Sequence, residues 1–165
     1  MHWIKSDYIT YALCQNDEQL AVLMYQEGAA SLLKIGNEVY SIRSKGIWNP
    51  SYNITSATRH IATLYHNFWG SSGVVRFLDG AAYNVKYAQM NEGCIRFVEQ
   101  GGTNEEVLRY GIHIRGNKPE PFLHVGTTLI DAEQLLILSA LGLHILLSMT
   151  REFMLPDDME FHVSA

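Results

Sequence analysis

The segment "LLILSALGLHILLSM", Leu135 to Met149, decides the fold of this chain. It is a nearly continuous run of apolar residues close to the C-terminal end of an acidic chain. Asp131 and Glu133 precede it, where acidic side chains stabilise the first turn of a helix. Pro156 blocks helical continuation beyond it. We therefore predict a helix over about residues 131–153.

The predicted helix has no polar side. At roughly 100° per residue, Ser139, His144 and Ser148 fall on different sides of the helix axis. A helix that is apolar all round must be enclosed by protein or by lipid. The apolar run spans roughly 22 Å, which is shorter than the roughly 30 Å hydrocarbon core of a bilayer. The chain is therefore predicted not to be transmembrane, and the helix is expected to lie inside the rest of the chain.

The remainder of the chain is a series of short apolar segments separated by turn residues. They include "QLAVLMY", "ASLLKI", "EVYSIR", "VVRFL", "AAYNVKY" and "CIRFVE". The dipeptide Asp79-Gly80 suits a type I′ hairpin turn. Links this short join antiparallel strands, and we predict about eleven of them. Residues 56–69 fit a helix or a strand, and a strand is favoured for the first half.

The segment "VLRYGIHIR" alternates more clearly than any other. One face of the segment is apolar and carries Leu108, Tyr110, Ile112 and Ile114. The other face carries Arg109, Gly111, His113 and Arg115. This period of two is typical of a strand with one side on a core and one side in water. We interpret the polar face as solvated surface rather than as a ligand site.

A sheet of this many strands can enclose an apolar helix by closing around it. Closure also removes the exposed edges of the sheet. The sequence resembles the tubby C-terminal-like family of tubby proteins, phospholipid scramblases and LURP-one-related proteins. The resemblance covers roughly residues 8–153 and rests on "DAEQLLILSALGLHILLSM", "EVYSIRSKGIW" and "LDGAAYNVKY". In length the chain is similar to the small prokaryotic members.

The resemblance implies a twelve-stranded barrel threaded by a C-terminal helix. The predicted fold is mainly β: a closed antiparallel barrel of about twelve strands that encloses a hydrophobic C-terminal α-helix. We expect one domain over residues 1–165, with the barrel at about 8–128. The central helix occupies about 131–153, and a short acidic tail occupies 154–165.

The functions of the resembled families do not map residue by residue onto this chain. Tubby proteins bind phosphoinositides through clustered basic residues, and scramblases carry a calcium-binding segment and palmitoylated cysteines. No oxygen-rich calcium loop is present in the sequence. The basic residues fall on different predicted strands: Lys34, Arg43, Lys45, Arg59, Arg76, Lys86 and Arg96.

Enzyme signatures are missing as well. The sequence has no G-x-S-x-G, P-loop, G-x-G-x-x-G or H-E-x-x-H motif, and "GSSG" at 70–73 is interpreted as a flexible loop. The histidines that we weighed as metal ligands are dispersed: His60, His66, His113, His124 and His144. We interpret His144 as a hydrogen-bonded core residue, and Cys14 and Cys94 as buried free thiols. We predict no cofactor, no metal ligand and no catalytic residue, and we assign no binding residue.

The formal net charge of −5 argues against nucleic-acid binding. The N-terminal residues lack the pattern of a signal peptide, so a cytoplasmic location is expected. The sequence predicts a non-enzymatic barrel that binds a phospholipid headgroup or a protein partner, or serves as a scaffold. The alternatives are a hollow lipocalin-like carrier of small ligands and an enzyme with an unrecognised site, including a metal site.

Overall fold

The computed structural model describes residues 1–26, 28, 30–47, 50–67, 69–88, 95–102, 104–115, 118–126, 129–149 and 162–163. Within these residues the chain forms thirteen strands and one helix. The elements are β1 (His2–Lys5), β2 (Thr10–Gln15), β3 (Glu18–Met24), β4 (Ser31–Ile35), β5 (Glu38–Lys45), β6 (Ser51–Ser56), β7 (His60–His66), β8 (Ser72–Phe77), β9 (Ala82–Tyr87), β10 (Ile95–Glu99), β11 (Glu106–Arg115), β12 (Lys118–Val125), α1 (Ala132–Met149) and β13 (His162–Val163).

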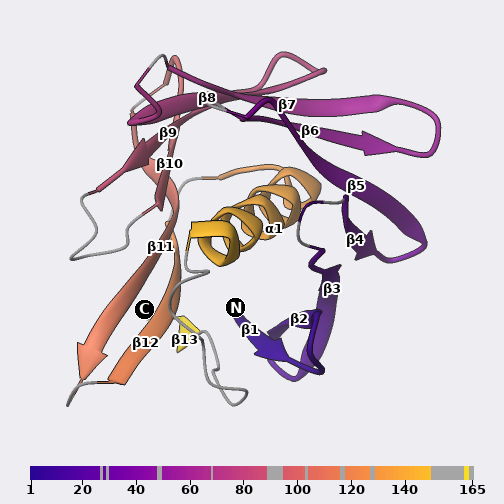
Figure 1. Ribbon diagram of the computed structural model, residues 1–165, viewed down its shortest axis with the longest axis vertical. Helices are drawn as coiled ribbons and strands as arrows, with labels where there is room; N and C mark the ends of the chain where they lie inside the picture. The colour runs from indigo at the N-terminus through magenta and orange to yellow at the C-terminus, as the bar shows by residue number, and fades with distance from the viewer. Residues whose placement is uncertain are drawn as a thin grey trace.

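The strands form one sheet in which every strand pairs with the next one along the chain. Pairing is antiparallel from β1 to β12, and the sheet curls around α1 into a nearly closed barrel (Figure 1). β13 pairs in parallel with β12 and also contacts β1, so it lies at the remaining gap. The prediction of an antiparallel barrel of about twelve strands around a C-terminal helix is confirmed.

The period-two patterns place apolar side chains on the inside of the barrel. On β11, Leu108 and Tyr110 are fully buried, Ile112 is partly buried and His113 is exposed, as the alternation predicts. The side chains of Ile114 and Arg115 lie outside the described residues. β7 (His60–His66) begins in the first half of the ambiguous segment 56–69 and continues into its second half, so the preference for a strand in the first half is confirmed.

The turn chemistry differs from the prediction at Asp79-Gly80. The hairpin between β8 and β9 is present, but Gly80 has a φ of +99° and Asp79 does not have a positive φ. A type I′ turn needs positive φ at both positions, so that assignment is wrong. A different turn has both central residues in the left-handed conformation. It joins β2 to β3 through Asn16 (φ 51°) and Asp17 (φ 63°).

The helix α1 is enclosed on all sides. Its buried residues run almost without interruption from Ile137 to Leu147, whereas Leu135 and Leu136 near its start are partly buried. Its 18 residues reach roughly 27 Å, so length and composition alone would allow it to cross a membrane. The length of the helix therefore does not exclude a membrane span, contrary to the prediction from the shorter apolar run. Burial decides the matter, because 67% of the helix is buried inside the barrel.

Both ends of the chain contribute strands that the sequence analysis missed. β1 precedes residue 8, where the barrel was expected to begin, and β13 lies within the predicted acidic tail. The helix is described as far as Met149, so its predicted extension over 150–153 lies outside the described residues.

A buried hydroxyl ties the start of the sheet to the helix. The indole N–H of Trp3 donates to the hydroxyl of Tyr110 on β11 over 2.6 Å. That hydroxyl donates in turn to the backbone carbonyl of Ser139 on α1, also over 2.6 Å. All three residues are inaccessible to solvent, so β1, β11 and α1 are locked together in the core.

Candidate functional site

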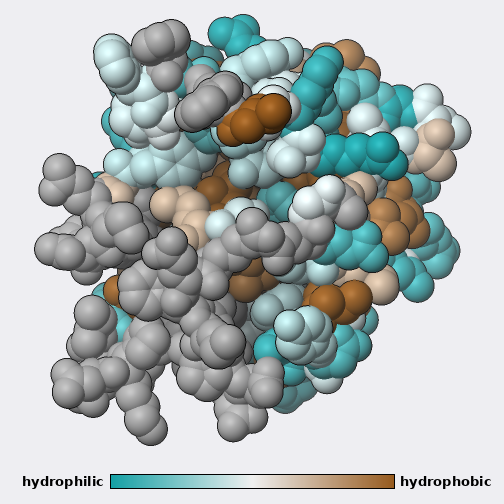
Figure 2. Space-filling model, in the orientation of Figure 1, coloured by the Kyte–Doolittle hydropathy of each residue, from teal (hydrophilic) through white to brown (hydrophobic). Residues whose placement is uncertain are grey.

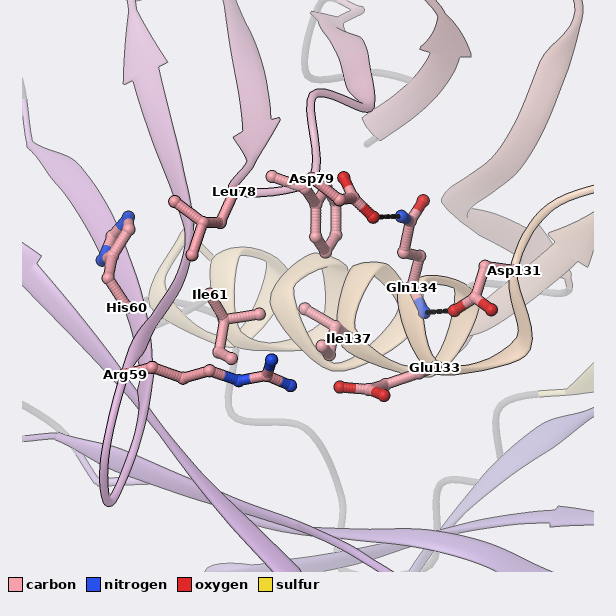
Figure 3. Close-up of a pocket in the computed structure, with 10 residues that line it drawn as sticks. Arg59, His60, Ile61, Leu78, Asp79, Asp131, Glu133, Gln134 and Ile137 are labelled. Atoms are coloured by element: carbon pink, nitrogen blue, oxygen red, sulfur yellow. Dashed lines mark hydrogen bonds between the residues drawn. The ribbon is translucent and has the colours of Figure 1, made fainter.

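The first concave region lies at the N-terminal end of α1 and has a volume of about 130 Å³ (Figure 3). Asp131 caps the helix by accepting a hydrogen bond from the backbone N–H of Gln134 over 3.0 Å. The side-chain amide of Gln134 donates to Asp79 over 2.7 Å and accepts from the hydroxyl of Tyr83 over 2.6 Å. Figure 3 shows Arg59 directed across this pocket toward Glu133.

We call this region the acidic pocket, because Asp79, Asp131 and Glu133 line it. Hydrogen bonds at the pocket anchor the helix in the barrel. Tyr40 on β5 donates to the carboxylate of Glu133 over 2.7 Å. Burial, reinforced by Glu133, raises the pKa of Tyr40 to about 12. Burial likewise raises the pKa of Tyr83 to about 12, with Glu99 adding to the shift. These tyrosines are therefore neutral donors that fix α1.

The second concave region is a groove of about 440 Å³ on the outside of the barrel, across β7, β8 and β9. Arg76 and Lys86 both line it, on neighbouring strands. Tyr65, Val74 and Asn84 also line it and belong to the outer face. The "GSSG" segment contributes Ser72 and Gly73, which belong to β8 rather than to a free loop.

A row of basic side chains continues from this groove across the next strands. The register pairs Lys86 on β9 with Arg96 on β10, and Arg96 with Arg109 on β11. Arg109 is paired with His124 on β12. Glu106 lies 3.6 Å from Arg96 and 3.1 Å from Arg109, so it bridges two members of the row. We call Arg76, Lys86, Arg96 and Arg109 the basic face.

The basic face changes the interpretation of the sequence. Arg76, Lys86 and Arg96 were regarded as scattered because they lie on different strands, and Arg109 was regarded as part of a solvated face. Opposed residues on paired strands have Cβ atoms about 4.5–5.5 Å apart. Lys86, Arg96 and Arg109 are consequently neighbours. The sequence could have indicated this alignment, because a prediction of the hairpin registers places Lys86, Arg96 and Arg109 opposite one another.

The histidines are dispersed in the structure, as the sequence indicated. His60 is hydrogen bonded to Thr63 over 2.9 Å, and the exposed ring of His113 stacks on Phe122 at 4.1 Å. His66 donates from Nδ1 to the carbonyl of Pro50 over 2.6 Å and accepts from the hydroxyl of Tyr87 over 2.7 Å. In the part of the chain that the structure describes, no three His, Cys, Asp or Glu residues are grouped to hold a metal ion. Cys14 is a partly buried free thiol, and Cys94 lies outside the described residues.

His144 is a buried core residue, as predicted. It is 4% exposed, and its Nδ1 lies 2.9 Å from the hydroxyl of Ser31 on β4. The rings of Tyr25 and Tyr52 each approach the imidazole with 5.4 Å between centroids. Burial lowers the pKa of His144 to about 4, so the imidazole is neutral at pH 7. Ser31 is completely buried, which excludes it as a nucleophile for an external substrate.

The depressed pKa of His144 predicts that the fold loses stability in mild acid. In the unfolded chain this pKa returns to about 6.5, so protons bind preferentially to the unfolded state. Stability is complete above pH 6.5 and decreases by up to about 1.4 kcal/mol per pH unit as the pH falls toward 4. Urea unfolding at a series of pH values measures this slope.

The variant His144→Gln should flatten the slope. The exposed His113 offers a control, because His113→Gln should leave it unchanged. His66, whose pKa burial also lowers, accounts for part of the remaining slope. An identical pH dependence in the wild type and in His144→Gln would contradict the prediction.

Comparisons with protein-family models, with curated proteins and with solved structures found no match to this chain. The fold and its surfaces define the class: a nearly closed antiparallel β-barrel with a buried central helix and a basic outer face. The resemblance to the tubby C-terminal-like family stays a prediction.

Proposed function

We propose that the protein is a non-enzymatic binding protein whose basic face recognises the anionic headgroup of a phospholipid. The observation that carries this proposal is the alignment of Lys86, Arg96 and Arg109 across three paired strands. Like charges directly opposed on neighbouring strands destabilise a sheet. Glu106 offsets part of this repulsion at Arg96 and Arg109, and a phosphate group offsets more while accepting several charge-assisted hydrogen bonds.

The groove beside the row provides a place for the headgroup. Arg76 and Lys86 line it, and the polar side chain of Asn84 is also present for hydrogen bonding to hydroxyl groups. Since the whole chain carries a net charge of −5, a locally basic surface gives the molecule a preferred side for approaching an anionic surface.

Exposed aromatic residues next to the groove favour a membrane-bound headgroup over a soluble phosphate. Trp69, in the turn between β7 and β8, is 83% exposed, and Tyr65 at the groove is 55% exposed. Trp and Tyr side chains are favoured at the boundary between lipid and water. Figure 2 shows that single hydrophobic residues also interrupt the otherwise hydrophilic surface on the face turned to the viewer.

The structure offers less support for the other two functions. A lipocalin-like carrier needs an open interior, and α1 occupies the interior of this barrel (Figure 1). An enzyme needs reactive groups that converge on an accessible space. The acidic pocket instead uses its polar groups to hold the helix.

Co-sedimentation with phosphatidylcholine vesicles, with and without phosphatidylserine, tests the proposal. The protein is expected to sediment with the anionic vesicles and to be released by added salt, which screens surface charges. Each basic residue near an anionic surface contributes about 1 kcal/mol. Lys86→Glu combined with Arg96→Glu should therefore weaken binding at least about 30-fold.

A matched variant controls for net charge. Lys34→Glu combined with Arg43→Glu makes the same change in charge on β4 and β5, away from the basic face, and should retain most of the binding. Equal losses of vesicle binding in the two double variants would show that binding depends on the net charge of the protein and not on the basic face. Failure of the wild type to bind anionic vesicles would overturn the proposal and favour a protein partner.

A further inference from the structure

A third concave region, a cavity, opens at the C-terminal end of α1, and His66 of the groove contacts Pro50 and Tyr52 in its lining. Its volume is about 190 Å³. Buried or partly buried residues form its floor, namely Tyr25, Tyr52, His144 and Ser148, and exposed residues that include Gln26 and Ser44 form its rim. None of the described residues that line it is charged.

The hydrogen bond to Ser31 fixes the tautomer of His144. The hydroxyl oxygen of Ser31 accepts from the backbone N–H of Gln26 over 3.0 Å. Ser31 is fully buried, so its own hydrogen needs an acceptor inside the protein. Among the described residues Nδ1 of His144 is the acceptor within reach, at 2.9 Å. The ring hydrogen therefore lies on Nε2, which is a donor.

Two polar atoms of the floor remain available to a ligand. Nε2 of His144 and the hydroxyl of Tyr52 have no hydrogen-bond partner among the described residues, although these side chains are 4% and 7% exposed. Each of these two atoms still has some surface in contact with solvent. Both residues line the cavity, which is the concave space beside these two atoms. Buried polar groups of this kind are normally satisfied by protein groups or by ordered water, and a ligand in the cavity takes the place of that water.

We propose that this cavity is a binding site for a small uncharged ring compound that carries a carbonyl or hydroxyl group. Nε2–H of His144 donates to the oxygen of the ligand, and the hydroxyl of Tyr52 makes a second hydrogen bond. The rings of Tyr25 and Tyr52 pack directly against the imidazole and form aromatic walls of the cavity. A cavity of about 150 Å³ holds benzene, so this slightly larger space suits a ring with one polar substituent.

The lining residues that the structure describes carry no charge, and this sets the specificity. A carboxylate in this cavity would lose its hydration with no cation to pair with among the described lining residues. Benzamide, phenol and benzoate are therefore suitable probes, since they share a ring and differ in the polar group. The cavity shares no lining residue with the groove, so this proposal and the proposed headgroup binding can fail separately.

Nuclear magnetic resonance of ¹⁵N-labelled histidine rings tests the proposal on the full chain. The signals of His144 should show the Nε2–H tautomer and should shift saturably on titration with benzamide and with phenol. Benzoate should bind at least about tenfold more weakly, because it is charged. If neither benzamide nor phenol shifts these signals up to its solubility, the cavity holds water only and the proposal is wrong.

The variant Tyr52→Phe separates ligand binding from a structural role. The hydroxyl of Tyr52 has no protein partner in the described residues, so its removal should leave the melting temperature almost unchanged. Binding of benzamide should weaken about 3- to 10-fold. Tyr8→Phe is the matched control, because Tyr8 is 87% exposed and does not line the cavity. Unchanged affinity in Tyr52→Phe, or equal binding of benzoate, would overturn the assignment.

Discussion

Replacing Leu141 with Asp is expected to leave no stably folded protein. Leu141 is completely buried near the middle of α1. Truncation of such a leucine costs about 2–5 kcal/mol, and an unpaired buried carboxylate costs several more. The sum approaches or exceeds the roughly 5–15 kcal/mol that stabilises a domain. Soluble yield and thermal unfolding followed by circular dichroism measure the effect.

The same substitution at Leu143 should be as damaging, because the barrel surrounds the helix. Leu141 and Leu143 lie roughly 160° apart around the helix axis, and both are inaccessible to solvent. Met149→Asp is the control on the same helix, since Met149 is 49% exposed and should change stability by less than about 1 kcal/mol. A folded Leu143→Asp protein with a nearly unchanged melting temperature would contradict a helix enclosed on both sides.

The enclosed helix could be predicted from sequence because it depends on local composition. No arrangement of the segment from Leu135 to Met149 gives a polar side, so the surroundings had to be apolar. The strands β3, β4 and β5 were predictable for a similar reason. They are short apolar segments separated by turn residues, and the links between them are too short for parallel pairing.

Elements with weak local signals were missed. β13 is two residues long and forms by pairing with β12, which its own sequence does not indicate. The left-handed turn at Asn16 and Asp17 contains no glycine, whereas Asp79-Gly80 has the sequence of a type I′ turn and a different geometry. Asn and Asp adopt positive φ often enough to serve in place of glycine.

The candidate sites depend on register and on long-range contacts, which composition does not provide. Lys86, Arg96 and Arg109 become neighbours through two strand pairings. Ser31 and His144 are 113 residues apart in the chain and meet inside the barrel. The sequence predicted that His144 would be buried and hydrogen bonded, but it held no information about its partner or about the cavity beside it.

Replacing Gly142 with Ala is expected to destabilise the protein, although alanine normally stabilises a helix by about 1 kcal/mol relative to glycine. A Cβ atom at this position would lie 2.5 Å from Cδ2 of Tyr110, closer still to Cε2, and 3.2 Å from Phe97. The clash should outweigh the gain in helix propensity, with a net cost of about 1–2 kcal/mol. Gly142→Leu should prevent folding. Urea unfolding of both variants measures the effect.

The physical reason is that the Tyr110 ring cannot move aside. Its hydroxyl is held by Trp3 and by the carbonyl of Ser139, each over 2.6 Å. Tyr110→Phe releases both hydrogen bonds and should cost about 1–3 kcal/mol by itself, because the buried Trp3 N–H loses its acceptor. The freed ring can then shift away from position 142. The double variant should therefore be more stable than the sum of the two single effects predicts. Strict additivity, or a Gly142→Ala protein more stable than the wild type, would show that Tyr110 does not limit the space beside the helix.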